Sequence, residues 1–195
     1  MISAVVLAAG NTEREGQSML FLPIQGKPVL QWVLDSVLAT SAIEVICVVR
    51  DLAAVRANIT VEDSRLSWLV NYGTDAGQSS SIVAGLWAVA RHSDAALFLP
   101  GDQPMRPCEL IDALIDRFNM GSAPIIAPTF QGRVRNPVLI GRELFSELLE
   151  LEGDHGALEF IEKNQNRLEL VPWNDAAPFM DIDDQADYER IKLLA

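Results

Sequence analysis

The sequence predicts an α/β protein with a mainly parallel sheet that is covered by helices on both faces. Apolar runs rich in β-branched residues alternate with segments whose apolar residues have helical spacing. Such a strand–helix–strand order is typical of parallel sheets. The 195 residues contain no linker, internal repeat or low-complexity segment, and this length suits one domain with a good core. We therefore expect a single domain over residues 1–195.

The expected elements follow from the apolar patterns in chain order. The first run, residues 2–9, is too short for a typical helix and suits a central strand of a parallel sheet. Further strands are expected at 43–49, 66–70, 94–100, 125–128, the end of the loop 131–140, and 168–171. Helices are expected at 29–39, 51–57, 82–90, 108–118, 143–151 and 185–194. Asp51 and Asp184 stand where the N-caps of two of these helices belong.

Composition and charge argue against several classes of function. Hydrophobic residues make up 49% and charged residues 22%, as in ordinary soluble globular proteins. The formal net charge of -12 argues against non-specific binding of nucleic acid. The start of the chain has no basic leader and no apolar run has membrane-spanning length, so we expect no membrane association. Cys47 and Cys108 lack the spacing of metal ligands, so we expect free thiols and a cytoplasmic location.

The first apolar run breaks at Gly10 and leads into a polar loop. In open α/β sheets, ligands bind beyond the carboxyl ends of the strands. Gly10 and Gly16 would allow positive φ and a close approach of backbone amides, and successive amides can form an anion-binding hollow. Arg14 could add a planar fork for a phosphate. An ordinary strand-to-helix loop without a ligand explains the same residue types, so both interpretations stay open on these residues alone.

This loop carries the first of several family resemblances. The run 7–10, followed by Arg14, Gly16 and the turn at 26–28, resembles the signature loop of the MobA-like nucleotidyltransferases, which include molybdenum-cofactor cytidylyltransferases and guanylyltransferases. The usual loop has Arg-Met-Gly and, after two further residues, a Lys that grips the triphosphate. Here Glu15 and Met19 stand at the Met and Lys positions. The resemblance implies a catalytic role for Arg14 and the following nucleotide-binding residues: Leu7, Ala8, Ala9, Gly10, Arg14 and Gly16.

A second polar loop, residues 71–81, leads into the helix expected at 82–90. It resembles the family's Asn…Gly…Ser-Ser…Gly segment, which lies by the base and ribose. The resemblance adds four nucleotide-binding residues: Asn71, Gly77, Ser79 and Ser81. A capped helix without a ligand would explain the serines equally well.

Two acidic segments resemble the family's metal site. The strand ending at Pro100 is followed by Gly101-Asp102-Gln103-Pro104, similar to the family's Ala-Asp-Gln-Pro, in which the Asp holds the metal. The run 181–184 resembles an Asp-Ile-Asp ending whose leading acids complete that site. The resemblance implies Mg²⁺ at Asp102, also a catalytic residue, with Asp181 as first choice for the second ligand and Asp183 as the alternate. Turn and helix-cap roles are the other interpretation of these acids.

The loop at 131–140 resembles the family's Gly-Arg-x-Gly-His-Pro-Val segment near the acceptor substrate. Arg135 and Asn136 replace its Gly and His. The resemblance implies Arg133, Arg135 and Asn136 as acceptor-binding residues, while solvated surface arginines are the alternative. The turn 153–157 resembles the family's Gly-Asp-x-Gly-Ala-Arg, with Leu158 in place of the Arg.

Together these resemblances imply a three-layer α/β/α sandwich with a mostly parallel, Rossmann-like sheet of the nucleotide-diphospho-sugar transferase type. They imply a Mg²⁺-dependent nucleotidyltransferase that binds a nucleoside triphosphate and a small phosphorylated acceptor such as molybdopterin and releases pyrophosphate, with a molybdoenzyme or maturation factor as a further partner. Ala9 resembles the cytidylyl branch and favours CTP as donor. Two alternatives remain: a transferase for another acceptor, and a nucleotide-binding or scaffold protein that has lost activity through the changes at Met19, Asn136 and Leu158.

Overall fold

The computed structural model describes residues 1–10, 13–14, 17–73, 77–121, 123–153 and 156–194. Its centre is an eight-stranded sheet built around β1 (Ile2–Ala8). β1 pairs in parallel with β6 (Glu44–Val49) and β8 (Ala95–Pro100), and β6 pairs in parallel with β7 (Leu66–Val70). The parallel sheet expected from the sequence is confirmed in this half of the molecule.

The other half of the sheet contains two reversed strands. β11 (Val138–Gly141) is antiparallel to both β8 and β9 (Ile125–Phe130). β9 also pairs with β10 (Arg133–Val134), which is antiparallel to it, and with β12 (Leu168–Pro172), which is parallel to it. Two short hairpins lie outside the main sheet: β2 (Glu13–Arg14) with β3 (Gln17–Ser18), and β4 (Pro23–Ile24) with β5 (Lys27–Pro28).

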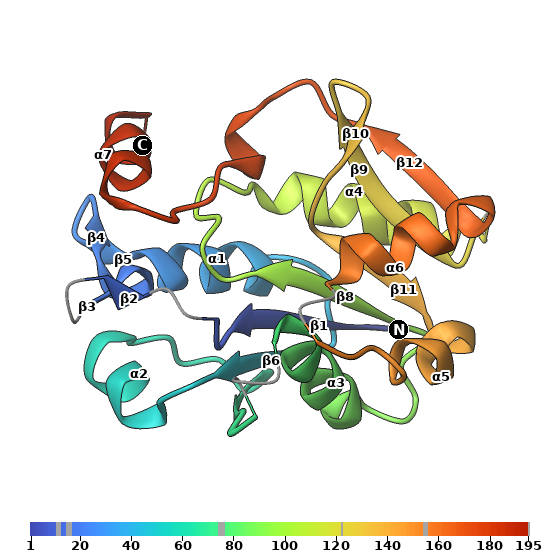
Figure 1. Ribbon diagram of the computed structural model, residues 1–195, viewed down its shortest axis with the longest axis horizontal. Helices are drawn as coiled ribbons and strands as arrows, with labels where there is room; N and C mark the ends of the chain where they lie inside the picture. Colours follow the sequence, from blue (N-terminus) through green and yellow to red (C-terminus); the bar gives the residue numbers. More distant parts are fainter. Residues whose placement is uncertain (11–12, 15–16, 74–76, 122, 154–155, 195) are drawn as a thin grey trace.

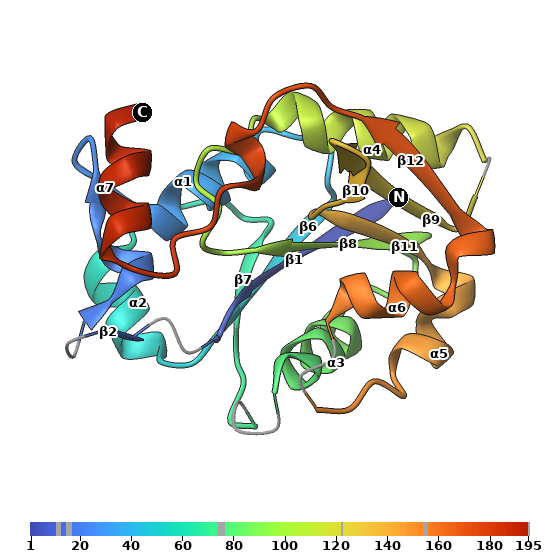
Figure 2. The same ribbon diagram turned by 45° about the horizontal axis from the view of Figure 1, so that its top comes forward.

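Helices cover both faces of the sheet, which confirms the three-layer sandwich (Figures 1 and 2). One face carries α1 (Val29–Leu38) and α4 (Cys108–Asn119), and the opposite face carries α3 (Gln78–Ala88), α5 (Phe145–Leu148) and α6 (Ala157–Lys163). α2 (Leu52–Asn58) follows β6. No helix in the described part of the chain is both long and apolar enough to cross a membrane.

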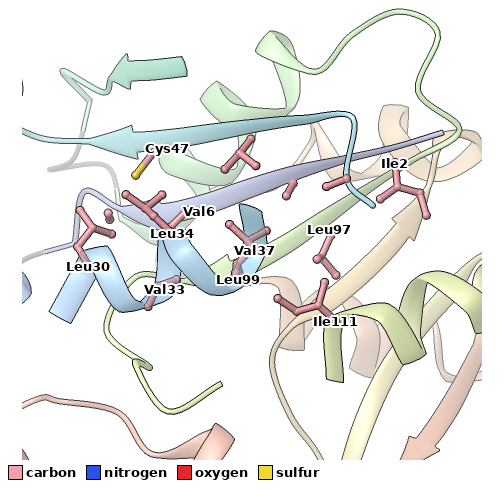
Figure 3. Close-up of a cluster of buried hydrophobic side chains, with 14 of the residues drawn as sticks. Ile2, Val6, Leu30, Val33, Leu34, Val37, Cys47, Leu97, Leu99 and Ile111 are labelled. Carbon is pink, nitrogen blue, oxygen red and sulfur yellow. The ribbon is translucent and has the colours of Figure 1, made fainter. Parts of the chain in front are cut away.

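The core forms on both faces of β1 because its side chains alternate and all but Leu7 are buried. Ala4 and Val6 join the cluster beneath α1 and α4, whereas Val5 joins the cluster beneath α3. Figure 3 shows the first cluster, where Val6, Leu34 and Cys47 lie together. Cys47 and Cys108 are free thiols, as expected, and burial raises the pKa of the Cys47 thiol well above its ordinary value.

A third apolar cluster fastens the end of the chain to its beginning. α7 (Gln185–Leu194) contributes Tyr188 and Ile191, which pack with Ile182 against Met19 and Ile24. The Tyr188 hydroxyl donates a hydrogen bond of 2.6 Å to the carbonyl oxygen of Pro23. In Figure 1 α7 accordingly lies beside the β4–β5 hairpin.

Most expected elements match the structure to within one or two residues. Both cap predictions are confirmed: Asp51 accepts hydrogen bonds from the N–H groups of Ala53 and Ala54, and Asp184 accepts one from Asp187. The helix expected at 82–90 instead begins at Gln78 and ends at Ala88, because the polar residues 78–81 form its first turn. The helix expected at 143–151 is only Phe145–Leu148, preceded by a 3-10 turn.

α6 was not expected from the sequence, since its first residues were interpreted as a turn motif. Its apolar residues do have helical spacing: Ala157, Phe160 and Ile161 are all buried. This spacing is the signal that could have revealed the helix.

Candidate functional site

The carboxyl ends of β1 and β8 meet at one edge of the sheet because the two strands are parallel. The N–H of Gly101 donates a hydrogen bond of 2.9 Å to the carbonyl oxygen of Leu7. A Cβ atom at position 101 would lie 3.0 Å from the Ala8 Cβ and 3.2 Å from the Leu7 oxygen. Glycine therefore allows the loop that carries Asp102 to leave the sheet directly beside the end of β1.

A cavity of about 230 Å³ opens at this edge, on the face that carries α3 and α6. It brings together Leu7, predicted to bind the nucleotide, and Asn136, predicted to bind the acceptor. The remaining lining residues come from the start of α3, the end of β8 and the start of α6: Gln78, Phe98, Pro100, Gly156, Ala157, Leu158 and Glu159. Ligand pockets typically reach about 300 Å³ or more, so this cavity matches a base or a ribose rather than a whole nucleotide.

Three of the predicted nucleotide-binding residues are buried around the start of α3. Asn71, Ser79 and Ser81 have exposed fractions of 7%, 3% and 6%. The Asn71 amide donates to the Ser81 hydroxyl at 3.1 Å, and Asn71 Oδ1 accepts the N–H of Gly73 at 2.9 Å. The N–H and hydroxyl of Ser79 both donate to the carbonyl oxygen of Gly153. These polar groups join the loop at 71–73 and the turn near Gly153 to the start of α3.

The glycines and alanines of the first loop differ in what they can offer a ligand. Ala8 and Ala9 are buried, so only their backbone groups are available. Gly10 is exposed and a Cβ atom there would meet nothing within 4 Å. Gly10 does not adopt the positive φ that glycine allows, whereas Gly77, before α3, has a φ of 90°. Gly16 and the Arg14 side chain lie outside the described residues.

The acidic residues predicted to bind metal lie near one another at the Asp102 loop. The N–H of Ile182 donates a hydrogen bond of 3.2 Å to the carbonyl oxygen of Asp102, which brings Asp181 and Asp183 beside this loop. Asp102 Oδ1 is buried and has no hydrogen-bond partner among the described residues. Burial raises the pKa of Asp102 to about 7, and the negative charges of Asp181 and Asp183 add to this.

The three carboxylates do not surround a single point. Among the described residues, no group of three or more His, Cys, Asp or Glu side chains is placed to hold a metal ion together. Mg²⁺ commonly takes only one or two carboxylates and completes its shell with phosphate oxygens and water. A buried carboxylate oxygen without a partner, with a second aspartate beside it, fits such a cation.

Two residues next to Asp102 were not predicted to belong to the site. Gln103 donates to Asp181 Oδ1 through its side-chain amide and accepts a hydrogen bond from Arg106. Both side chains are buried, with exposed fractions of 5% and 3%. Burial lowers the pKa of Arg106 to about 10, although the charges of Asp102 and Asp181 favour its protonated form. Arg is almost never fully buried unless it is paired, but the position of Arg106 in the sequence, between Pro104 and Pro107, gave no sign of its burial.

The predicted acceptor arginines lie at the same edge of the sheet but do not line the cavity. Arg133 is exposed on β10, opposite Phe130 of β9. The Arg135 N–H donates to the carbonyl oxygen of Pro128 at 2.9 Å, and its Nε is buried without a hydrogen-bond partner in the described part of the chain. Beyond β12, Trp173 Nε1 is likewise buried without a described partner. These two donors lie near the end of β9, and Trp173 was missed from the sequence.

Comparison with known proteins identifies the family. Residues 4–168 match the sequence profile of the MobA-like NTP transferase domain. The chain belongs to this family. It is similar to the purine catabolism protein PucB of Bacillus subtilis, with 25% identity over 196 residues, which are 96% of this chain and 94% of PucB.

Solved structures share the fold over nearly the whole chain. Rv0371c from Mycobacterium tuberculosis matches with a TM-score of 0.87 and 25% identity, covering 98% of this chain and 97% of that one. A structure of Rv0371c complexed with manganese matches with a TM-score of 0.84 and 24% identity, over 100% and 99% of the two chains. CMP:2-keto-3-deoxy-manno-octonic acid synthetase complexed with CTP matches with a TM-score of 0.74 and 15% identity, over 99% and 97%.

Met19 differs from the Lys expected at this position in a MobA-like NTP transferase domain. Its side chain is 4% exposed and packs in the third apolar cluster with Ile24, Ile182 and Tyr188. The methionine thus fastens the C-terminal segment instead of presenting a cation. Leu158, which stands in place of the Arg of the family motif, lines the cavity of about 230 Å³.

Proposed function

We propose that this chain is a Mg²⁺-dependent nucleotidyltransferase that moves CMP from CTP onto a small phosphorylated acceptor such as molybdopterin. The observation that carries this is the pairing of Asp102 with Asp181 at the carboxyl edge of the sheet, where Asp102 Oδ1 is buried and lacks a described hydrogen-bond partner. Membership of the MobA-like family supports the reaction type. The Leu-Ala-Ala-Gly run and the fold shared with a CTP-bound synthetase support CTP as donor.

The nucleotide would lie across the end of β1 and the start of α3. Leu7 and Gln78 would contact the base or ribose in the cavity, and the backbone of residues 8–10 would approach the phosphates. Gly16 and Arg14 would complete the phosphate-binding loop. Asn71, Gly77, Ser79 and Ser81 would hold the wall around the base, because their contacts join it together.

A divalent cation would be held by Asp102 and Asp181, with Asp183 as the alternate ligand. When bound, such a cation neutralises the negative charge of nucleotide phosphates. The manganese in the Rv0371c structure supports a divalent cation in this fold. The two aspartates would have to be ionised to bind it, which costs free energy for Asp102 because its carboxyl is buried beside a like charge.

The acceptor would approach from β10 and the loop before β11. Arg133 and Arg135 would anchor its phosphate, and Asn136 would contact it from the cavity wall. One oxygen of that phosphate forms a bond to the α-phosphorus of CTP, the bond from this phosphorus to the β-bridging oxygen breaks, and pyrophosphate leaves. Such catalysis rests on positioning and charge neutralisation. We expect the reaction in the cytoplasm, with a molybdoenzyme or maturation factor receiving the product.

A second candidate is a nucleotide-binding or scaffold protein of the same fold without transferase activity. The burial of Met19 and the presence of Leu158 at the cavity favour it, since both positions usually carry a cation in the family pattern. Removal of a cation that stabilises a transition state commonly lowers the rate by about a hundredfold or more. A transferase for another phosphorylated acceptor is the third candidate, with Arg14, Arg133 and Arg135 handling the phosphate charge.

Calorimetric titration with CTP, GTP, ATP and UTP, each with and without Mg²⁺, tests the proposal. We expect CTP to bind only with Mg²⁺, and pyrophosphate to appear when molybdopterin is added. Asp102→Asn should abolish the Mg²⁺-dependent binding of CTP. The control Asp94→Asn, at the opposite end of β8 beside the chain's amino group, should retain this binding. Binding without pyrophosphate release would favour the inactive protein. Absence of binding for all four nucleotides would refute a nucleotide site.

A further inference from the structure

A chain of two buried side chains connects the core to Asp181. Arg106 Nη2 donates a hydrogen bond to Gln103 Oε1, and Gln103 Nε2 donates one to Asp181 Oδ1. Gln103 and Asp181 are 78 positions apart in the sequence. The main chain of Arg106 is itself held, because the Ser36 hydroxyl of α1 donates to its carbonyl oxygen at 2.7 Å. The path therefore begins at a packed helix and ends at an exposed carboxylate.

The chemistry of the guanidinium determines which way the amide points. An Arg side chain offers only donors, so the Gln103 oxygen has to face Arg106. The NH₂ group of the same amide then has to face Asp181, where it can only donate. An amide without Arg106 could rotate and present its oxygen to the carboxylate, which would repel it. Arg106 therefore orients a donor toward Asp181 without touching the carboxylate itself.

We propose that Gln103 and Arg106 are positioning residues that hold Asp181 in place beside Asp102 for a divalent cation. This inference rests on the proposed function, because it concerns the same cation site. The backbone hydrogen bond from Ile182 to Asp102 places the segment, and the amide orients the carboxylate by binding Oδ1. The other oxygen, Oδ2, would remain to bind the cation. Groups that orient metal ligands typically alter metal affinity 10- to 100-fold when removed.

Electrostatics alone would give the opposite effect for Arg106. A buried positive charge beside Asp102 and Asp181 repels a cation, so its loss should strengthen cation binding if Arg106 acts only by its charge. If Arg106 acts by orienting Gln103, its loss should weaken cation binding. The sign of the change in affinity therefore separates the two roles, and Gln103→Leu tests the same link with no change of charge.

The experiment measures binding of Mn²⁺ alone to the full chain, freed of metals beforehand, by the electron paramagnetic resonance signal of unbound Mn²⁺. The variants are Gln103→Leu, Arg106→Met and the double substitution, with thermal unfolding followed by circular dichroism. Arg142→Met is the control, because Arg142 is another arginine that donates hydrogen bonds, to the backbone oxygens of Ser93 and Ala90, but lies at the opposite edge of the sheet. Arg106→Lys, which keeps both the charge and a donor for Gln103, is the conservative variant, and Gln103→Leu carries the test if Arg106→Met does not fold.

We expect each single substitution to raise the Kd for Mn²⁺ by about tenfold, and the double substitution to raise it no further, since both remove the same link. Arg106→Lys should restore most of the affinity that Arg106→Met loses, because an ammonium group also offers only donors and can orient Gln103 in the same way. Arg142→Met should leave the Kd unchanged. Unchanged or tighter binding by Arg106→Met, or unchanged binding by Gln103→Leu, would overturn the inference.

The failure of this inference differs from the failure of the proposed function. If the natural protein binds Mn²⁺ and Asp102→Asn abolishes binding, while Gln103→Leu and Arg106→Met bind normally, the cation site stands and only the positioning roles are refuted. If the natural protein does not bind Mn²⁺ at all, both the cation site and the positioning roles are refuted.

Discussion

The N–H of Ile182 donates a hydrogen bond of 3.2 Å to the carbonyl oxygen of Asp102. This contact joins the C-terminal segment to the loop after the central strand β8, and it brings two further aspartates beside Asp102. Ile182 is fully buried in the third apolar cluster, so the contact is supported by packing from Met19 and Tyr188. The stability of that cluster and the geometry of the acidic site are therefore linked.

The pKa of Asp102 predicts how stability depends on pH. Burial, then the charge of Asp181, raises this pKa from 3.8 to about 7. Between these values the folded state holds a proton that the unfolded state has lost, so the free energy of unfolding should fall as pH rises from about 4 to 7. Asp102→Asn removes this dependence, and in the absence of divalent cations it should be more stable than the natural protein at pH 8 by roughly 1 to 3 kcal/mol.

Urea unfolding of both proteins in EDTA at pH 4.5 to 8 checks this prediction. The difference in unfolding free energy should be small at the acid end and should grow toward pH 8. A constant difference across this range would show that Asp102 keeps an ordinary pKa.

Met19→Lys should destabilise the fold rather than simply restore the family's cation. The ammonium group would enter a cluster formed with Ile24, Ile182 and Tyr188, at a cost of about 2 kcal/mol or more, whereas Met19→Leu should cost less than about 1.5 kcal/mol. Denaturant unfolding measures both. A Met19→Lys protein as stable as Met19→Leu would mean that the lysine reaches solvent, and a gain in CTP affinity would then be expected.

Leu158→Arg would restore the Arg of the family motif at a position that, unlike Met19, lines the cavity. Leu158 lines the cavity of about 230 Å³, so an Arg there can reach phosphate or ribose groups at its mouth. We expect the Kd for CTP with Mg²⁺ to fall by about tenfold, the size typical of a charge-assisted hydrogen bond. Leu170→Arg on β12 is the control, since it adds the same charge at an exposed leucine that does not line the cavity. Equal gains in both variants would indicate a general effect of charge.

Gly85→Ala should destabilise the packing of α3 on the central strand. The new Cβ would lie 2.4 Å from Val5 Cγ1 and 3.2 Å from Val48 Cγ2, so the helix has to move outward at a cost of about 1 to 3 kcal/mol. Val5→Ala should restore part of the stability in the double variant. Gly10→Ala, where the Cβ would meet nothing within 4 Å, should stay within about 0.5 kcal/mol of the natural protein. Thermal unfolding compares the four proteins.

The fold was predictable because its signals are local and repeated. The strand expected at 66–70 and the helix expected at 185–194 agree with β7 and α7 in both bounds. The errors have local causes too. α3 begins with Gln78 and three serines, which weaken the apolar pattern of its first turn, and the motif at 153–157 predicts a turn where α6 begins. The reversal of β11 depends on pairing with β8 and β9, which no local pattern encodes.

The sequence by itself determined the α/β class, the order of strands and helices, and the family resemblance of the acidic segments at Asp102 and Asp181, because these depend on residue types and spacing along the chain. Only the tertiary structure decided that Met19 belongs to an apolar cluster, that Asn71 and Ser79 join distant segments at the start of α3, and that Arg106 and Gln103 lead to Asp181. These contacts join residues distant in sequence, and burial and hydrogen-bond partners exist only once the chain has folded.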